Sequence, residues 1–344
     1  MRYTILSFII MLAVIAAKAQ QLPCCLPSGD QGMHHVQGFA YDALHDRFYL
    51  SFTTRLVVLD SKGKLVASVE GLTGHLGDLA LDAGSRILYG SIEYKHDAIG
   101  NNIQRSLGKT NSATTGFYIA MFPIDSICSV GMSADYVMRT AYLNRPVEDY
   151  LAKVENDGRI WDHRYGCSGI DGVALAPGPG KRSRMCLYVA YGIYGELERT
   201  DNDNQVILCY DTRDLIRHAE PLMPDNLHTN GPRRHVAESH VPTGNTTFGI
   251  QNLTYDAEQR LFYAAVYPGK KPQYPNYGLF TFGGKNLQEV KGYRFPYGST
   301  GFEAMGDGLF YVSHNERKDN QESTTLCLYR WTGNDSQPLK RITE

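Results

Sequence analysis

The chain has 344 residues and a formal net charge of −2, with 42% hydrophobic and 20% charged residues. This is a globular composition, long enough for one large domain or two ordinary ones. A net charge near zero argues against a nucleic-acid-binding or anionic-membrane surface. The 23 tyrosines, 34 glycines and 15 prolines favour a protein of many short strands and turns.

The first 19 residues have the pattern of a signal peptide. Arg2 supplies the positive charge, the apolar run ILSFIIMLAVIAA follows, and Ala17-Lys18-Ala19 matches a small-residue cleavage site. The apolar run is too short to span a membrane comfortably, and no other segment of the sequence approaches a span. We therefore expect an exported protein, periplasmic or extracellular, whose mature chain (20–344) forms a single domain.

Seven cysteines in an exported chain permit disulfides without dictating how they pair. The adjacent Cys24 and Cys25 could tie down the N-terminal tail. Cys186 and Cys209 lie in strand-like runs, which suits either buried free thiols or one cross-strand bridge. The remaining cysteines are Cys128, Cys167 and Cys327. The odd number leaves at least one cysteine unpaired or paired between chains.

Five segments share one pattern: an apolar strand, a tight turn rich in Asp, Gly or Pro, and a strand with a large apolar residue before Tyr. The segments span 38–52, 78–92, 172–191, 252–266 and 301–314. Their tyrosines fall in register, at Tyr49, Tyr89, Tyr188, Tyr263 and Tyr311. Self-similarity of this kind indicates a repeat architecture.

A further strand candidate follows each Tyr strand, at 55–60, 117–125, 205–211, 277–282 and 325–331. Several of these are followed by a fourth candidate, and the alternation and turn spacing predict antiparallel sheet. A repeated four-stranded antiparallel unit is the arrangement of a β-propeller, so we predict an all-β propeller of five blades. A degenerate sixth blade would fit in 101–165 or 212–247. Within these stretches we expect a helix at 145–156 and a loop at 225–240, both as insertions on one face.

The motif x-x-[apolar]-x-x-D-x-x-x-x-[apolar]-Y resembles the blade motif of the broad propeller group that includes NHL-type and SMP-30-type lactonase proteins. The resemblance covers most of the mature chain. The stretch 73–100 is also similar to uncharacterised exported bacterial propeller proteins. The resemblance implies architecture and no single function, because propellers host hydrolases, lyases, lactonases and plain binding modules.

Polar residues just ahead of each first strand should converge at the mouth of the central channel. A ring of carboxylates, imidazoles and amides from different blades is a candidate substrate or metal site. Read in chain order, these residues are His34, His35, Gln37, His75, Asp78, Asp171, Gln251, Asn252, Ser299 and Thr300, with Glu303 one position into its strand.

The second repeat unit differs from the others where its Tyr strand ends. The stretch LYGSIEYKHDAIG (88–100) continues from the strand into Glu93, Lys95 and His96, and then into what we expect to be a Gly-containing loop. In an antiparallel pair the end of the second strand returns to the start of the first. We therefore expect Glu93 to lie beside His75 and Asp78.

Two further segments carry candidate ligand-binding residues. The run 157–172 leads into Asp171 and contains Arg164, whose planar fork suits a carboxylate or sulfate, and Tyr165. His314 ends the fifth Tyr strand. No G-x-S-x-G elbow, phosphate loop, H-E-x-x-H, EF-hand loop or dinucleotide fingerprint is present, so we expect no nucleotide or flavin cofactor.

These residues support two hypotheses about function. The first is an exported hydrolase or lyase, glycan-active or lactonase-like, acting on a carbohydrate or related polar small molecule. Glu93 or Asp171 would serve as acid or base, His75 as a proton shuttle, and Arg164 or Lys95 as charge stabilisers. His35, Gln37, Lys95, Tyr165, Gln251 and His314 would bind the substrate.

A variant of the first hypothesis places a divalent cation at the channel mouth, with Asp78 and Glu303 among its oxygen ligands. Ca²⁺ is the cation that this variant favours. The second hypothesis is a non-catalytic propeller that binds a ligand or a protein. The uneven distribution of polar residues between the units favours the enzyme, because a repeated binding site would place the same residues in every blade. We expect a monomer under either hypothesis.

Overall fold

The computed structural model describes residues 22–343, apart from 33, 111–113, 181–183, 224 and 319–320. The signal peptide expected at 1–19 lies outside the described residues. Among the described residues, no helix is long and apolar enough to cross a membrane.

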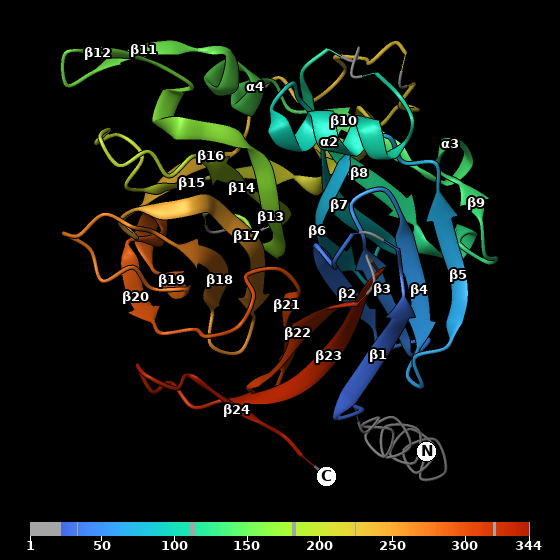
Figure 1. Cartoon of the computed structure of the whole chain (residues 1–344). Helices are drawn as coiled ribbons and strands as arrows, with labels where there is room; N and C mark the ends of the chain where they lie inside the picture. The colour runs from blue at the N-terminus through green and yellow to red at the C-terminus, as the bar shows by residue number, and fades with distance from the viewer. Residues whose placement is uncertain are drawn as a thin grey trace, which may run out of the picture.

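Five antiparallel sheets in the described part of the chain form the blades of a propeller (Figure 1). Blade 1 comprises β2 (Gly38–Asp42), β3 (Arg47–Ser51), β4 (Leu56–Asp60) and β5 (Leu65–Glu70), with β9 (Met132–Ser133) added in parallel. Blade 2 comprises β6 (His75–Asp82), β7 (Ile87–Tyr94), β8 (Gly116–Pro123) and β10 (Arg139–Tyr142). Blade 3 comprises β13 (Cys167–Pro177), β14 (Met185–Ile193), β15 (Gln205–Asp211) and β16 (Ala237–Val241).

The last two blades complete the ring. Blade 4 comprises β17 (Thr246–Asp256), β18 (Leu261–Pro268), β19 (Leu279–Gly283) and β20 (Glu289–Tyr293). Blade 5 comprises β21 (Phe302–Gly306), β22 (Leu309–Lys318) and β23 (Gln321–Trp331). The prediction of a five-bladed all-β propeller is confirmed, and the sixth blade is absent from the described residues.

Both ends of the described chain pair with the same strand of blade 5. β1 (Cys25–Asp30) pairs antiparallel with the first half of β23, and β24 (Leu339–Arg341) pairs with the last three residues of β23. Figure 1 shows the blue β1 beside the red β23. The N-terminal strand therefore closes the ring by completing the last blade.

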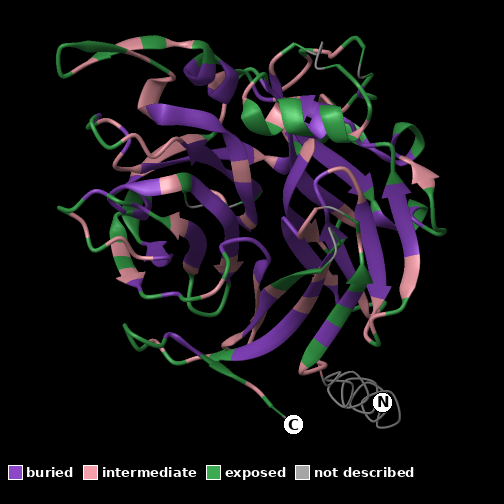
Figure 2. Ribbon diagram, in the orientation of Figure 1, coloured by how far each residue is buried: buried purple, intermediate pink, exposed green. Residues whose placement is uncertain are grey.

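The first strands of the five blades line the channel, and each contacts the next around the ring in the order β2, β6, β13, β17, β21 and back to β2. The repeated tyrosines lie in the second strands and are buried, as expected of residues in the blade core. Apolar clusters join neighbouring blades, and buried residues follow the strands throughout the ring (Figure 2). Each blade thus buries its faces against its neighbours.

The long connections form insertions rather than a sixth blade. α4 (Asn144–Leu151) confirms the expected helix, although 153–156 forms β11 (Lys153–Asn156) of a hairpin with β12 (Arg159–Asp162). The segment 225–240 ends in β16, the fourth strand of blade 3, so its last residues are strand and not loop. The connections also contain two short helices, α3 (Ala134–Val137) and α5 (Thr212–Arg217).

The loop expected after Asp97 is a helix, α2 (Ala98–Ser106). The Asp97 carboxylate accepts a hydrogen bond from the backbone N–H of Gly100 at 2.8 Å, which satisfies a donor of the first turn. Ile103 packs inward while most of the opposite face is exposed, so tertiary contact outweighs the weak helix propensity of Gly100 and two asparagines. Figure 1 shows α2 lying over the ends of β6 and β7.

Candidate active site at the channel mouth

Irregular strand pairing marks one end of three first strands. The register shifts between Leu76 and Leu79 in β6, between Ile170 and Val173 in β13, and between Thr247 and Asn252 in β17. A bulge adds a residue and re-aims side chains. These bulges contain Asp78, Asp171 and Gln251, all of them predicted site residues. The departure from regular pairing is what turns these polar groups toward the channel axis.

Asp78 and Asn252 close the channel at its axis. The Asp78 carboxylate accepts hydrogen bonds from the backbone N–H of Val173 at 3.0 Å and of Leu253 at 2.9 Å, and from the Asn252 amide at 2.7 Å. Asn252 in turn accepts from the backbone N–H of Phe302 at 2.9 Å. This plug ties blades 2, 3, 4 and 5 together, and its polar atoms are used up in doing so.

A pocket of about 340 Å³ lies on one side of this plug, beneath α2. Its walls come from four blades and from the helix. The residues that line it are His34, His35, Gln37, Thr53, His75, Glu93, Lys95, Ile99, Asn102, Ile103, Ser168, Asp171, Phe248, Gln251 and Tyr267.

Glu93 is the centre of a buried charge cluster in this pocket. Its carboxylate lies 2.5 Å from the Lys95 ammonium and 3.4 Å from Nδ1 of His75, and it accepts a hydrogen bond from the backbone N–H of Ile170 at 3.1 Å. Burial alone would raise the pKa of Glu93, but Lys95 and His75 outweigh it and hold the pKa below its usual range. Glu93 is therefore ionised at neutral pH.

Gly169 makes this arrangement sterically feasible. Its φ is +134°, and a Cβ at this position would lie 1.9 Å from Oε2 of Glu93. Any larger residue would displace the carboxylate or the strand. A glycine at the third position of β13 is therefore required by the position of the Glu93 carboxylate.

The pKa of Asp171 is shifted in the opposite direction to that of Glu93. Gln251 donates a hydrogen bond to its Oδ2 at 3.0 Å, and desolvation in the pocket, with the nearby charge of Glu93, raises the pKa of Asp171 to about 7. His75 and Lys95 lower that pKa but do not outweigh burial. Asp171 is therefore about half protonated near neutral pH, which is the condition for exchanging a proton with a substrate.

The pocket combines polar and apolar walls. Burial and the neighbouring His75 lower the pKa of His34, and burial lowers that of His35, so both imidazoles are neutral near pH 7. The pocket is also lined by Phe248, an exposed aromatic residue at φ +64°, whose ring makes an edge contact with Tyr267. A bulky residue rarely adopts a positive φ, and such backbone conformations cluster at functional sites.

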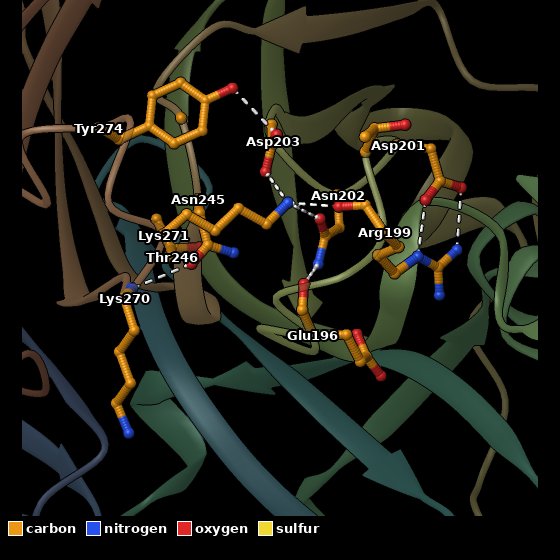
Figure 3. A network of polar contacts seen from close by, with 12 residues as sticks. Glu196, Arg199, Asp201, Asn202, Asp203, Asn245, Thr246, Lys270, Lys271 and Tyr274 are labelled. Atoms are coloured by element: carbon orange, nitrogen blue, oxygen red, sulfur yellow. Dashed lines mark hydrogen bonds and ion pairs between the residues drawn. The ribbon is translucent and has the colours of Figure 1, made fainter. Parts of the chain in front are cut away.

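A polar network braces the two loops beside this aromatic wall (Figure 3). The buried Lys271 ammonium lies 2.5 Å from the Asp203 carboxylate and donates to Asn202 at 2.8 Å, while Tyr274 donates to Asp203 at 2.9 Å. The loop that carries Lys271 continues directly from β18, which holds Tyr267. The network therefore holds the loop that follows Tyr267 in place, although none of the network residues lines the pocket.

Comparisons with known proteins add little to this geometry. No protein-family model and no curated protein matches the chain. A solved structure called "Structure of Dos1 propeller" is similar over 90% of this chain and 70% of that chain, with a TM-score of 0.33 and 10% sequence identity. A similarity at this level carries no functional argument.

Of the twelve residues to which the sequence assigned a catalytic, substrate-binding or metal-binding role, seven line this pocket: His35, Gln37, His75, Glu93, Lys95, Asp171 and Gln251. The pairing of His75 with Glu93 in the β6–β7 register confirms the expected juxtaposition of strand entry and strand exit.

The structure places the other five residues elsewhere. Arg164 donates to Asp149 at 2.9 Å outside the pocket, as a structural ion pair. Tyr165 packs edge-on against the ring of His240, and Nε2 of His314 lies 2.9 Å from the hydroxyl of Tyr329. Asp78 belongs to the plug.

Glu303 lies beyond the plug, in a separate cavity of about 160 Å³ lined by Ala80, Val173, Thr254 and Tyr255, among others. Along β6, β13 and β17 the pocket residues come first, then the residues at the plug, then those that line this second cavity. Asp78 is engaged in the plug and Glu303 lines the separate cavity, and no cluster of three or more His, Cys, Asp or Glu side chains among the described residues could hold a metal ion.

Sequence reasoning missed the contribution of α2 and of the aromatic wall. Ile99, Asn102 and Ile103 reach the pocket from α2, and Ser168 and Phe248 line it from β13 and β17, close in sequence to the predicted residues Asp171 and Gln251. The available signal for α2 was Asp97, an N-cap residue three positions before Gly100.

Proposed function

We propose that the pocket is the active site of an exported hydrolase or lyase that acts on a carbohydrate or a related polar small molecule. The observation that carries the proposal is the pair of carboxyl groups with divergent pKa values. Glu93 is held ionised and Asp171 has a pKa raised to about 7, both in one pocket. Environments that push the pKa values of neighbouring groups apart are how acid and base roles are divided.

The roles follow from the contacts. Asp171, when protonated, is the general acid that donates its proton to the oxygen of the leaving group. His75 is the general base, and Glu93 orients its imidazole through Nδ1 and stabilises the positive charge that the imidazole gains. Lys95 keeps Glu93 ionised.

The same two proton transfers serve hydrolysis and elimination. In hydrolysis, His75 takes a proton from water as the oxygen attacks, and Asp171 protonates the departing oxygen. In elimination, His75 takes a proton from carbon, the C–O bond breaks, and Asp171 again protonates the oxygen that leaves.

The lining of the pocket matches the chemistry of a sugar. Sugars present hydroxyl groups at the edge of the ring and C–H groups on its faces. Gln37, Gln251 and the imidazoles offer hydrogen bonds, while Phe248 and Tyr267, with Ile99 from α2, offer an apolar surface for a ring face.

The test is a screen of the purified mature protein on a panel of glycans and lactones, with and without EDTA. We expect turnover of at least one compound, and a loss of about 100-fold or more in the Glu93→Gln variant, because the amide cannot balance a charged imidazole. Undiminished turnover in that variant would remove Glu93 from the chemistry. Activity lost in EDTA and restored by Ca²⁺ would support metal assistance.

The screen also distinguishes the enzyme from the second hypothesis, a non-catalytic binding propeller. A compound that binds the wild-type pocket, with weaker binding in the Glu93→Gln variant and no turnover at any pH, would make the chain a non-catalytic binding propeller.

A further inference from the structure

All seven cysteines carry free thiols in the structure, yet two of them face each other across the strand pair that closes the ring. Cys25 on β1 is paired in register with Cys327 on β23, and their sulfur atoms lie 3.6 Å apart. One cysteine is exposed and the other buried. They are separated by 302 positions in the sequence.

The strand register suits a disulfide at this position. The backbone N–H of Leu328 donates to the carbonyl oxygen of Cys24 at 2.9 Å. Cys24 and Leu328 are therefore a hydrogen-bonded pair of the ladder, next to Cys25 and Cys327. Cys25 and Cys327 therefore form a non-hydrogen-bonded pair, in which Cα atoms lie about 4.5 Å apart. A disulfide requires a Cα separation of about 4.4–6.8 Å, so little backbone movement is needed.

Arg341 provides a chemical environment for thiol exchange. Its Nη2 lies 3.2 Å from the sulfur of Cys25 and 3.1 Å from that of Cys327. A guanidinium at this distance stabilises a thiolate, which is the reactive form. Burial and the neighbouring Cys25 raise the pKa of the Cys327 thiol to about 11, and Arg341 acts against that rise.

We propose that Cys25 and Cys327 form a disulfide in an oxidising compartment and thereby lock the N-terminal strand into the last blade. The exposed Cys25 thiolate attacks one sulfur of oxidised glutathione, which gives a mixed disulfide and releases one glutathione thiolate. The Cys327 thiolate then attacks the Cys25 sulfur and releases the second glutathione. The two protein thiols lose two electrons and two protons, and one oxidised glutathione becomes two reduced molecules.

The consequence is a covalent bond between the N-terminal strand and the blade that it completes. Without the bond, β1 is held to blade 5 by strand pairing, by packing and by side-chain hydrogen bonds such as the one that Ser28 accepts from the backbone N–H of Thr324. With it, the closed loop contains nearly the whole described chain, and cross-links that close long loops are expected to stabilise most.

The test is peptide mapping of the mature protein after incubation with oxidised glutathione. We expect one cross-linked peptide pair, joining the tryptic peptide that contains Cys24 and Cys25 to the one that contains Cys327. Cys24→Ser is the matched control and should keep the cross-link, since strand alternation turns Cys24 to the opposite face. Cys25→Ser should abolish it. A cross-link that survives in Cys25→Ser, or free thiols at both positions in the oxidised wild type, would overturn the proposal.

Two further measurements do not depend on cysteine variants folding well. Dithiothreitol should lower the thermal midpoint of the oxidised wild type by about 5 °C. Arg341→Gln should slow oxidation by glutathione several-fold while the matched Lys340→Gln leaves the rate unchanged. An unchanged thermal midpoint after reduction would contradict stabilisation by the Cys25–Cys327 disulfide. Equal oxidation rates in the two variants would contradict the role of Arg341.

Discussion

Asp171 and Glu93 line one pocket, yet their environments shift the two pKa values in opposite directions. The difference arises from their partners. Glu93 contacts an ammonium group at 2.5 Å and a backbone N–H donor, whereas the Asp171 carboxylate accepts a hydrogen bond from a neutral amide. At the scale of single residues, the site is therefore defined by which carboxylate has a cation beside it.

Asp171→Asn is expected to lose activity and to gain stability relative to the wild type as the pH rises. The folded pKa of Asp171, about 7, lies above its unfolded value of about 4. The wild type therefore loses stability relative to the variant as pH rises from about 4 to about 7, by at most about 4 kcal/mol, and the difference stays constant above that. Denaturant unfolding of both proteins at pH 4 and pH 8 measures this. A stability difference between the two proteins that is the same at pH 4 and pH 8 would refute the raised pKa.

The Glu93–Lys95 pair provides a stability prediction. Lys95→Met leaves a buried carboxylate without its cation and should cost about 3–5 kcal/mol in the free energy of unfolding. The double variant Glu93→Gln/Lys95→Met should recover much of that loss, because neither member of the pair then carries a charge. As a control, Lys153→Met removes the exposed partner of Asp162 and should leave the urea midpoint unchanged. Additive effects in the double variant would contradict the pairing.

Gly169→Ala tests how closely the backbone must approach Glu93. The new Cβ would collide with Oε2 of Glu93, so we expect loss of activity and a large drop in thermal midpoint. Gly158→Ala is the control, because Gly158 also has a positive φ (+76°) but nothing lies within 4 Å of the position of its Cβ. Equal effects of the two substitutions would show that the conformation of Gly169, and not its contact with Glu93, is what matters.

At the scale of elements, α2 is the part of the site that belongs to no blade. It is anchored at its start, where the Asp97 carboxylate caps the first turn and accepts a hydrogen bond from the Tyr194 hydroxyl at 3.0 Å. Ile99 and Ile103 reach the pocket from this helix. The cap therefore connects helix stability to the shape of the pocket.

Asp97→Ala should loosen α2 and raise KM more than it lowers kcat. Loss of an N-cap costs about 1–2 kcal/mol, so amide hydrogen exchange across 98–106 should accelerate about 5- to 30-fold. Asp97→Asn keeps a good capping residue and should behave almost like the wild type. Unchanged exchange in the alanine variant would show that packing alone holds the helix.

The regular elements were predictable from the sequence, and the irregular ones were not. The register of Tyr49, Tyr89 and their counterparts reports strand pairing, which depends on local alternation and repeats in every blade. The contact between Glu93 and His75 could be predicted from the same register, since antiparallel pairing fixes which residues are neighbours. The bulges at Asp78 and Asp171, the helix α2 and the φ of Phe248 depend on contacts between distant segments, and local patterns do not encode such contacts.

At the scale of the whole molecule, the plug divides the channel into two chambers, and each chamber contains a carboxyl group whose pKa is raised. Asp171 lines the pocket beneath α2, and Glu303 lines the smaller cavity beyond Asp78 and Asn252. Burial raises the pKa of both Asp171 and Glu303. Only the first shares its chamber with an imidazole base and an ionised partner.

The comparison of kcat/KM for Asp171→Asn and Glu303→Gln, on the compound found in the screen, is the most direct test of the pocket as the active site. Both variants replace a channel carboxyl group with its amide. The account predicts a loss of about 100-fold or more for Asp171→Asn and a change of less than about threefold for Glu303→Gln. Equal losses, or a larger loss for Glu303→Gln, would contradict it.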